Sequence, residues 1–186
     1  ELTRRNPENL RYRYSAGLLA YESHQYSEVY IHLNKIIELD PDSHSAYYYM
    51  GLSALRQDLQ TQALSYLHQV QKGADRLNAI TLLVDLENPD EDQREGYFDR
   101  LRDQNQDLSA EIYSLEVQFL QGIGQIESAV VSYQDALKEH PQNIPLLYSY
   151  ALFAQSLHQF NTTEQMLLRI IDIEPNHINA LNALGY

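Results

Sequence analysis

Seven histidines are the residues of this sequence that could bind a metal ion or transfer protons. They stand at positions 24, 32, 44, 68, 140, 158 and 177, and no two of them are three or four residues apart. One helix face therefore cannot present a pair of them to a metal ion. The sequence also has no cysteine, which excludes a thiolate zinc site, a disulfide and a cysteine nucleophile. We expect histidines at solvated turns, no metal site and no cofactor.

Other catalytic patterns are absent from the sequence. It contains neither Gly-x-Ser-x-Gly nor His-Glu-x-x-His, and Gly122-Ile123-Gly124 is not followed by the Lys-Ser/Thr of a phosphate-binding loop. Carboxylate pairs occur, but a catalytic pair needs a closed pocket with little water. The sequence therefore predicts a protein that is not an enzyme. An enzyme regulated by the rest of the chain stays as a third hypothesis, which would require a bound metal or cofactor.

Tyrosine is the residue type whose abundance points to a function. The chain has 15 tyrosines, and nine of them precede residue 67, including the run Tyr47-Tyr48-Tyr49. Tyrosine combines a large rigid surface with a polar tip, which suits it to protein interfaces. The alternative is that most tyrosines fill the core or its rim, with Tyr47 between neighbouring units and Tyr49 against its partner helix.

The charge balance limits the partners that the chain can have. Thirteen Lys and Arg stand against 26 Asp and Glu, a net charge of −13, which argues against nucleic acid and against an anionic membrane surface. No apolar run approaches 18 residues, so we expect no direct membrane insertion by this chain. Residues 103–186 carry 2 basic and 10 acidic side chains. This acidic half either keeps the chain soluble or attracts a basic partner.

Residue spacing reveals a repeat that must position these side chains. Gly17 and Gly51 are 34 residues apart, as are Pro141 and Pro175. This period is typical of stacked helix pairs. Asn161 followed by Glu164 predicts the N-cap of a second helix within one pair.

The period divides the chain into repeat units. Small residues should let the two helices of a unit cross closely, and we expect Gly17, Gly51, Ala63, Ala129 and Ala136 to be buried there. We predict an all-α fold of about eleven helices and no strand, a right-handed superhelical solenoid of antiparallel helix pairs. Residues 1–186 form a single solenoid in this prediction, with repeats at 10–43, 44–77, 78–109 (degenerate), 110–143 and 144–177 and a truncated repeat at 178–186.

These residues resemble the tetratricopeptide repeat (TPR) family over nearly the whole chain. The resemblance rests on Tyr47, Met50-Gly51, Ala54, Ala63, Leu67 and Val70, and on the Leu-Asp-Pro, His-Pro and Glu-Pro endings. It implies a non-catalytic scaffold that binds a peptide or partner protein in a concave groove lined by the first helix of each unit. The positions of a lysine and asparagine clamp used by some members hold Tyr14 and Leu18 here, so a carboxylate clamp is not expected.

Projection onto that family geometry predicts the groove residues. Arg11, Tyr14, Leu18 and Tyr21 should line it in the first unit, and Ser45, Tyr48, Leu52 and Arg56 in the second. Later units should add Glu111, Ser114, Gln118, Gln121, Tyr148, Leu152 and Gln155. The candidate partner-binding residues are Arg11, Tyr14, Tyr21, Tyr48, Arg56, Gln118 and Tyr148.

A narrower resemblance lies in the order of three segments, 73–79, 145–152 and 173–186. Its most specific part is the closing Asn182-Ala183-Leu184-Gly185-Tyr186 of the third segment. Their order is similar to that of bacterial outer-membrane TPR lipoproteins, including the adaptor of a periplasmic carboxyl-terminal processing protease. This resemblance implies a periplasmic adaptor that is anchored to the outer membrane in the full-length protein. The alternative is a scaffold of a cytoplasmic or pilus-type assembly complex.

The two ends of the sequence lead to one more expectation. The chain begins at Glu1 without Met and ends as an apolar pattern restarts, so we expect an excised fragment. The helix that would cover Ile178, Leu181 and Leu184 is then missing, and we expect self-association through residues 170–186.

Overall fold

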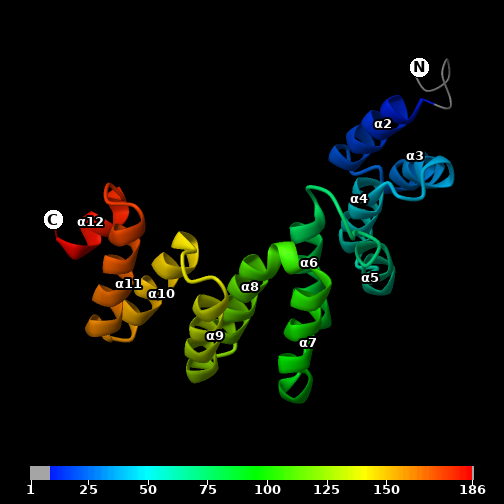
Figure 1. Ribbon diagram of the computed structural model, residues 1–186. Coiled ribbons are helices and arrows are strands. Elements are labelled where there is room, and N and C mark those ends of the chain that lie inside the picture. Colours follow the sequence, from blue (N-terminus) through cyan, green and yellow to red (C-terminus); the bar gives the residue numbers. More distant parts are fainter. Residues whose placement is uncertain (1–8, 186) are drawn as a thin grey trace. The chain divides into compact units, whose positions relative to one another are not determined.

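The computed structural model describes residues 9–185, apart from the side chain of Glu95 (Figure 1). Over this range the regular structure is entirely helical, which confirms the predicted all-α fold of about eleven helices. In chain order the elements are α2 (Leu10–Glu22), α3 (Tyr26–Leu39), α4 (His44–Leu55), α5 (Gln60–Leu67), α6 (Arg76–Glu87), α7 (Glu91–Gln104), the short 3₁₀ helix η1 (Gln106–Leu108), α8 (Ser109–Gly122), α9 (Ile126–Glu139), α10 (Ile144–Ser156), α11 (Phe160–Ile173) and α12 (Ile178–Leu184).

The chain forms two compact units, which divide between Asp90 and Glu91. In the first unit, α2 pairs with α3 and α4 pairs with α5, and α6 packs on α5. In the second unit, α8 pairs with α9 and α10 with α11, while α7 packs on α8 and α12 on α11. The predicted degenerate repeat 78–109 spans the division, so a single solenoid over 1–186 stays a prediction.

The turn inside each helix pair shows the repeat in the backbone itself. His24, Asp58, Gly124 and His158 all have φ between 57° and 76°. The amide of the following residue donates in each case to the carbonyl five residues earlier, as in Gln25 N to Ala20 O at 2.8 Å and Gln159 N to Ala154 O at 2.9 Å. This is the Schellman ending of a helix, which satisfies its last carbonyls. Two of the seven histidines are thus explained by turn geometry.

Close helix crossings need residues without a large side chain. Gly17 and Gly51 are buried, and so are Ala63, Ala129 and Ala136, as predicted. A Cβ atom added to Gly51 would lie 2.8 Å from Leu67 Cδ2 and 2.9 Å from Leu67 Cγ, because α4 and α5 approach closely at this point. Gly17 has the same relation to Leu33, with the added Cβ 2.7 Å from Leu33 Cδ2.

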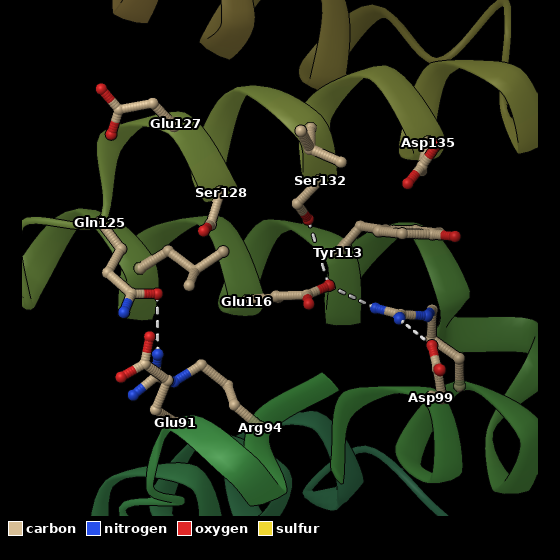
Figure 2. Close-up of a pocket in the computed structure, with 13 residues that line it drawn as sticks. Glu91, Arg94, Asp99, Tyr113, Glu116, Gln125, Glu127, Ser128, Ser132 and Asp135 are labelled. Atoms are coloured by element: carbon tan, nitrogen blue, oxygen red, sulfur yellow. Dashed lines mark hydrogen bonds and ion pairs between the residues drawn. The ribbon is translucent and has the colours of Figure 1, made fainter. Parts of the chain in front are cut away.

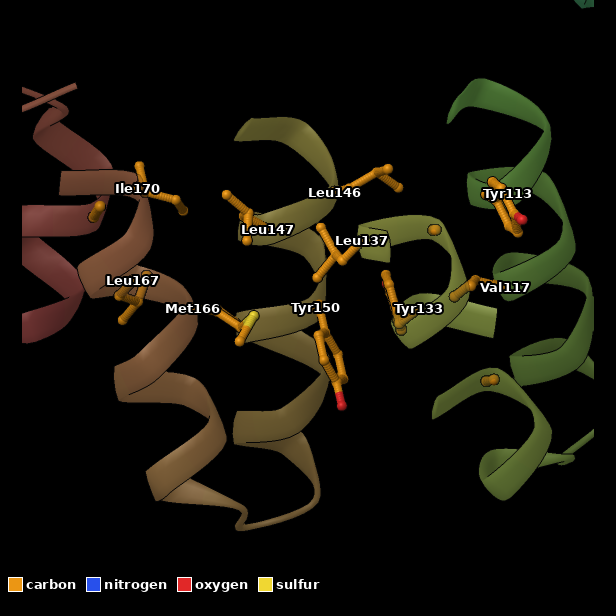
Figure 3. Packing of buried hydrophobic residues seen from close by; sticks show 14 of the residues in the cluster. Tyr113, Val117, Tyr133, Leu137, Leu146, Leu147, Tyr150, Met166, Leu167 and Ile170 are labelled. Atoms are coloured by element: carbon orange, nitrogen blue, oxygen red, sulfur yellow. The ribbon is translucent and has the colours of Figure 1, made fainter. Parts of the chain in front are cut away.

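The core of the second unit is a continuous cluster from α8 to α12 (Figure 3). Tyr133 of α9 and Tyr150 of α10 stack with ring centroids 4.8 Å apart and 17° between the ring planes. Both rings are buried, and Val117 and Leu147 complete the packing around them. Tyr133 and Tyr150 therefore serve the core, as the alternative interpretation of the tyrosines proposed.

One predicted cap is wrong. Gln159, not Asn161, is the N-cap residue of α11, and it makes no side-chain capping bond. The Schellman turn at His158 already orients the chain into the next helix, so Asn161 lies inside the first turn of α11. Within residues 9–185, no helix combines the length and the apolar character needed to cross a membrane.

Candidate partner-binding site

Four tyrosines of α2 and α4 meet in the first unit, and Tyr49 lies at their centre. Its ring contacts those of Tyr14, Tyr21 and Tyr48 edge to face, with centroid distances of 6.1, 5.6 and 5.5 Å. All four side chains are half-buried, so each has part of its ring covered and part open to solvent. We call Tyr14, Tyr21, Tyr48 and Tyr49 the tyrosine face. Edge-to-face contacts stabilise such rings beyond the area that they bury, which holds the face in shape.

Burial and a nearby carboxylate favour the neutral form of three tyrosines of the tyrosine face. Burial raises the pKa of Tyr14, Tyr48 and Tyr49 above the ordinary value, and the nearby carboxylate of Asp75 raises the pKa of all three further. Asp75 is itself held by Ser45, whose hydroxyl donates to its Oδ2 at 2.6 Å. The shifts favour the neutral hydroxyl form of Tyr14, Tyr48 and Tyr49, and a neutral hydroxyl can donate a hydrogen bond to a partner.

The predicted site residues fall into two sets. Arg11 lies exposed on α2, and Arg56 lies exposed at the C-cap of α4. A hydrogen bond to Tyr21 raises the pKa of Arg56, so this arginine stands beside the tyrosine face. Gln118 and Tyr148 belong to the second unit, where Gln118 is exposed on α8 and Tyr148 is half-buried on α10. One concave surface that joins both sets stays a prediction.

The second unit contains a cleft that sequence reasoning missed (Figure 2). It has a volume of about 560 Å³ and lies between α7 and α9, with Tyr113, Glu116 and Leu120 of α8 as its floor. Residues from the three helices and from the α8–α9 turn line it, namely Glu91, Arg94, Asp99, Arg102, Tyr113, Glu116, Leu120, Gln125, Glu127, Ser128, Val131, Ser132 and Asp135.

A hydrogen-bonded network fixes the floor of the cleft. The guanidinium of Arg102 donates to Glu116 Oε2 at 2.5 Å and also to Asp99, and it lies 4.1 Å from the centre of the Tyr113 ring. Ser132 donates to the same Glu116 oxygen at 3.1 Å. Burial raises the pKa of Glu116 in spite of these partners, and burial raises the pKa of Tyr113 to about 12.

The histidines of the described part of the chain contact neighbouring helices and turns rather than a metal site. In residues 9–185, the His, Asp and Glu side chains form no group of three that could hold a metal ion. His68 pairs with Glu87 at 2.8 Å, and His44 Nδ1 lies 2.8 Å from the carbonyl oxygen of Gln69. These histidines link α5 and its following turn to neighbouring helices.

No family model matches the sequence. The chain is 31% identical over 144 residues to the TPR repeat-containing protein PA4667 of Pseudomonas aeruginosa. That alignment covers 76% of this chain and 24% of the relative, so the chain spans about a quarter of that protein's length. Among solved structures, this chain is similar to YrrB, a TPR protein with an unusual peptide-binding site. The two align with a TM-score of 0.51 and 19% identity over 100% of this chain and 96% of YrrB. The chain has the tetratricopeptide repeat fold.

A second solved structure, that of MamA, also has this fold. MamA aligns with a TM-score of 0.52 and 12% identity over 97% of each chain.

Two features of the chain were not predicted from its sequence. The alternative interpretation of the tyrosines placed Tyr49 against its partner helix, and the structure also brings its ring into contact with the three predicted tyrosines. Tyr49 lies 35 residues after Tyr14, one more than the repeat period. This offset is the signal that could have placed Tyr49 against the preceding repeat. The cleft has no such signal, because Arg102 and Glu116 are 14 residues apart, a spacing unrelated to the repeat period.

Proposed function

We propose that this TPR chain is a non-catalytic scaffold whose tyrosine face binds an extended peptide segment of a partner protein. The proposal rests on one observation, the contact of the Tyr49 ring with the rings of Tyr14, Tyr21 and Tyr48. Arg56 is hydrogen-bonded to Tyr21 at the edge of this tyrosine face. Tyrosine and arginine are the residue types in which binding energy concentrates at protein interfaces. The peptide-binding site of YrrB supports the class of ligand.

The physical character of the face suits a peptide backbone. Rigid, partly exposed rings give contact area at a small cost in side-chain entropy, because tyrosine has only two rotatable side-chain bonds. Their neutral hydroxyl groups can pair with the carbonyl and amide groups of an extended chain. Arg56 adds an exposed cation, which favours an acidic side chain or a terminal carboxylate at that end of the peptide.

Peptide selection tests the proposal. Random dodecapeptides displayed on phage are selected on the wild-type chain, and the enriched peptides are synthesised and titrated by calorimetry. The triple variant Tyr14→Ala/Tyr48→Ala/Arg56→Ala should bind them at least tenfold more weakly, since interface anchors are each worth about 2 kcal/mol. Tyr12→Ala/Lys35→Ala changes an exposed tyrosine and an exposed cation outside the face and should leave affinity unchanged. Equal affinity for the triple variant, folded by circular dichroism, would reject the assignment.

We also propose that the full-length protein is an adaptor of the bacterial envelope, anchored to the outer membrane and recruiting a periplasmic protease. The closing segment 182–186 and the segments 73–79 and 145–152 support this place by resemblance, and the similarity to PA4667 supports a bacterial source. Fractionation of cells that express the full-length protein tests the location. A lipidated form in the outer-membrane fraction supports an envelope adaptor, whereas a cytoplasmic form favours the alternative, a cytoplasmic or pilus-type assembly scaffold.

A further inference from the structure

We propose that the cleft between α7 and α9 is a second docking site, for a partner segment in which an Arg or Lys side chain adjoins an apolar one. This site is separate from the tyrosine face, because all of its lining residues belong to the second unit. It would attach a different segment of a partner, or a different partner, to the same scaffold.

The cleft has the size and rigidity of a binding site. Its volume of about 560 Å³ lies in the range of ligand pockets in proteins. The Arg102–Glu116–Ser132 network ties α7 to α8 and α9 along its floor. At the other end, Arg94 Nη1 donates to Gln125 Oε1 at 2.8 Å, and its guanidinium lies 5.3 Å from the centre of the Phe119 ring. The walls are thus held in place before a ligand arrives, which lowers the entropic cost of binding.

Charge selects the class of ligand. Five carboxylates and two guanidinium groups line the cleft, an excess of three negative charges. Both guanidinium groups are engaged with the cleft walls, Arg102 by Glu116 and Arg94 by Gln125. Asp99 also pairs with Arg102, whereas Glu91 and Glu127 are exposed. The carboxylates of Glu91 and Glu127 are open to a cation from a partner.

An apolar contact beside the carboxylates indicates a peptide rather than a free amine. Val131 of α9 lines the cleft and is 53% exposed, and the buried Leu120 of α8 also lines it. A second cavity of about 530 Å³ adjoins the cleft and shares Asp99, Arg102 and Tyr113 with it. The extended trough and its exposed valine suit several residues of a chain, of which one is basic and one apolar.

The cleft and the predicted groove residue Gln118 lie on different sides of α8. Glu116 and Gln118 are two residues apart on α8 and so point about 200° apart around the helix. The cleft therefore lies on the side of α8 away from exposed Gln118, which belongs to the predicted groove. A basic segment in the cleft would leave that groove position free.

Nuclear magnetic resonance with two synthetic peptides tests this inference. The probe is acetyl-Ala-Arg-Leu-Arg-Ala-amide, and its control replaces both arginines with glutamate. The arginine peptide should shift the amide signals of Glu91, Arg94 and residues 125–135, and the glutamate peptide should not. Shifts confined to the tyrosine face or to the Gln118 side of α8, or no shifts at millimolar peptide, would overturn the inference.

Matched variants separate a built site from general attraction to an acidic chain. Glu91→Gln/Glu127→Gln should weaken binding of the arginine peptide about fivefold, the effect of two partly screened ion pairs. Glu164→Gln/Asp172→Asn removes the same charge from exposed positions of the second unit that line neither the cleft nor the predicted groove, and it should leave affinity unchanged. Equal weakening by both double variants would overturn the inference.

Val131→Thr tests the apolar contact, because the substitution keeps the shape of an exposed side chain. It should weaken the arginine peptide roughly threefold through lost apolar burial. A version of the peptide with Ser in place of Leu should bind Val131→Thr and the wild type equally. If Val131→Thr binds the leucine peptide as tightly as the wild type does, the cleft is not the docking site.

Discussion

Replacing Gly51 with alanine should destabilise the first unit, although alanine is the better helix former. In a helix interior the change normally gains about 0.5–1 kcal/mol. The new Cβ would lie 2.8 Å from Leu67 Cδ2 and 2.9 Å from Leu67 Cγ, so Leu67 or one of the helices must shift. Such overpacking costs about 1–3 kcal/mol. The expected result is a net loss of about 0.5–2 kcal/mol.

Gly96 of α7 supplies the matched control. A Cβ there would meet only the end of the Arg100 side chain, Nη1 at 3.4 Å, so Gly96→Ala should stabilise by about 0.5–1 kcal/mol. Urea denaturation followed by far-ultraviolet circular dichroism compares the two variants, provided that the denaturant slope is unchanged.

A double-mutant cycle then identifies the cause. In a Leu67→Ala background the atoms in conflict are gone, so adding Gly51→Ala should stabilise rather than destabilise. The reasoning fails if Gly51→Ala stabilises the wild type as much as Gly96→Ala does, or if the effect of Gly51→Ala is the same in both backgrounds.

Four further outcomes follow from the structure. Ala129→Leu should cost roughly 1–3 kcal/mol in urea denaturation, because Ala129 is fully buried where α8 and α9 cross. Arg102→Met leaves the buried carboxylate of Glu116 without its cation and should cost about 3 kcal/mol in the same assay. Tyr113 should ionise near pH 12 in an ultraviolet titration, and since its pKa is raised in the folded state, the stability it contributes should be full below pH 10 and lost as the pH rises from 10 to about 12. Ile178, 71% exposed on α12, should mediate self-association, so Ile178→Ser should raise the monomer fraction in sedimentation at high concentration.

The helical repeat could be predicted from the sequence because its signals are local. Glycine at 17 and 51 marks the crossings, and the 34-residue period recurs in the turns at His24 and Asp58 and again at Gly124 and His158. The cap at Asn161 was wrong because a Schellman turn one position before the N-cap sets the entry of the chain, and the capping-box pattern does not register it.

The site could be predicted only in part. The family geometry correctly placed Tyr14, Tyr21 and Tyr48 on α2 and α4. The contacts of Tyr49 depend on how far one repeat is displaced against the next. The cleft depends on Arg102 reaching Glu116 across η1 and the α7–α8 connection, and on Arg94 reaching Gln125, 31 residues later. Such contacts are decided by the packing of three helices, which no spacing in the sequence encodes.

Photochemical cross-linking at Tyr48 tests the central claim, peptide binding by the tyrosine face, most directly. p-Benzoylphenylalanine replaces Tyr48 in the full-length protein in living cells, and a second form carries it at Ile31, which is 58% exposed on α3. The account predicts that the Tyr48 form gives an adduct in which mass spectrometry locates one defined segment of a partner, and that the Ile31 form does not give this adduct. The same adduct from both positions, or an adduct from Ile31 alone, would contradict it.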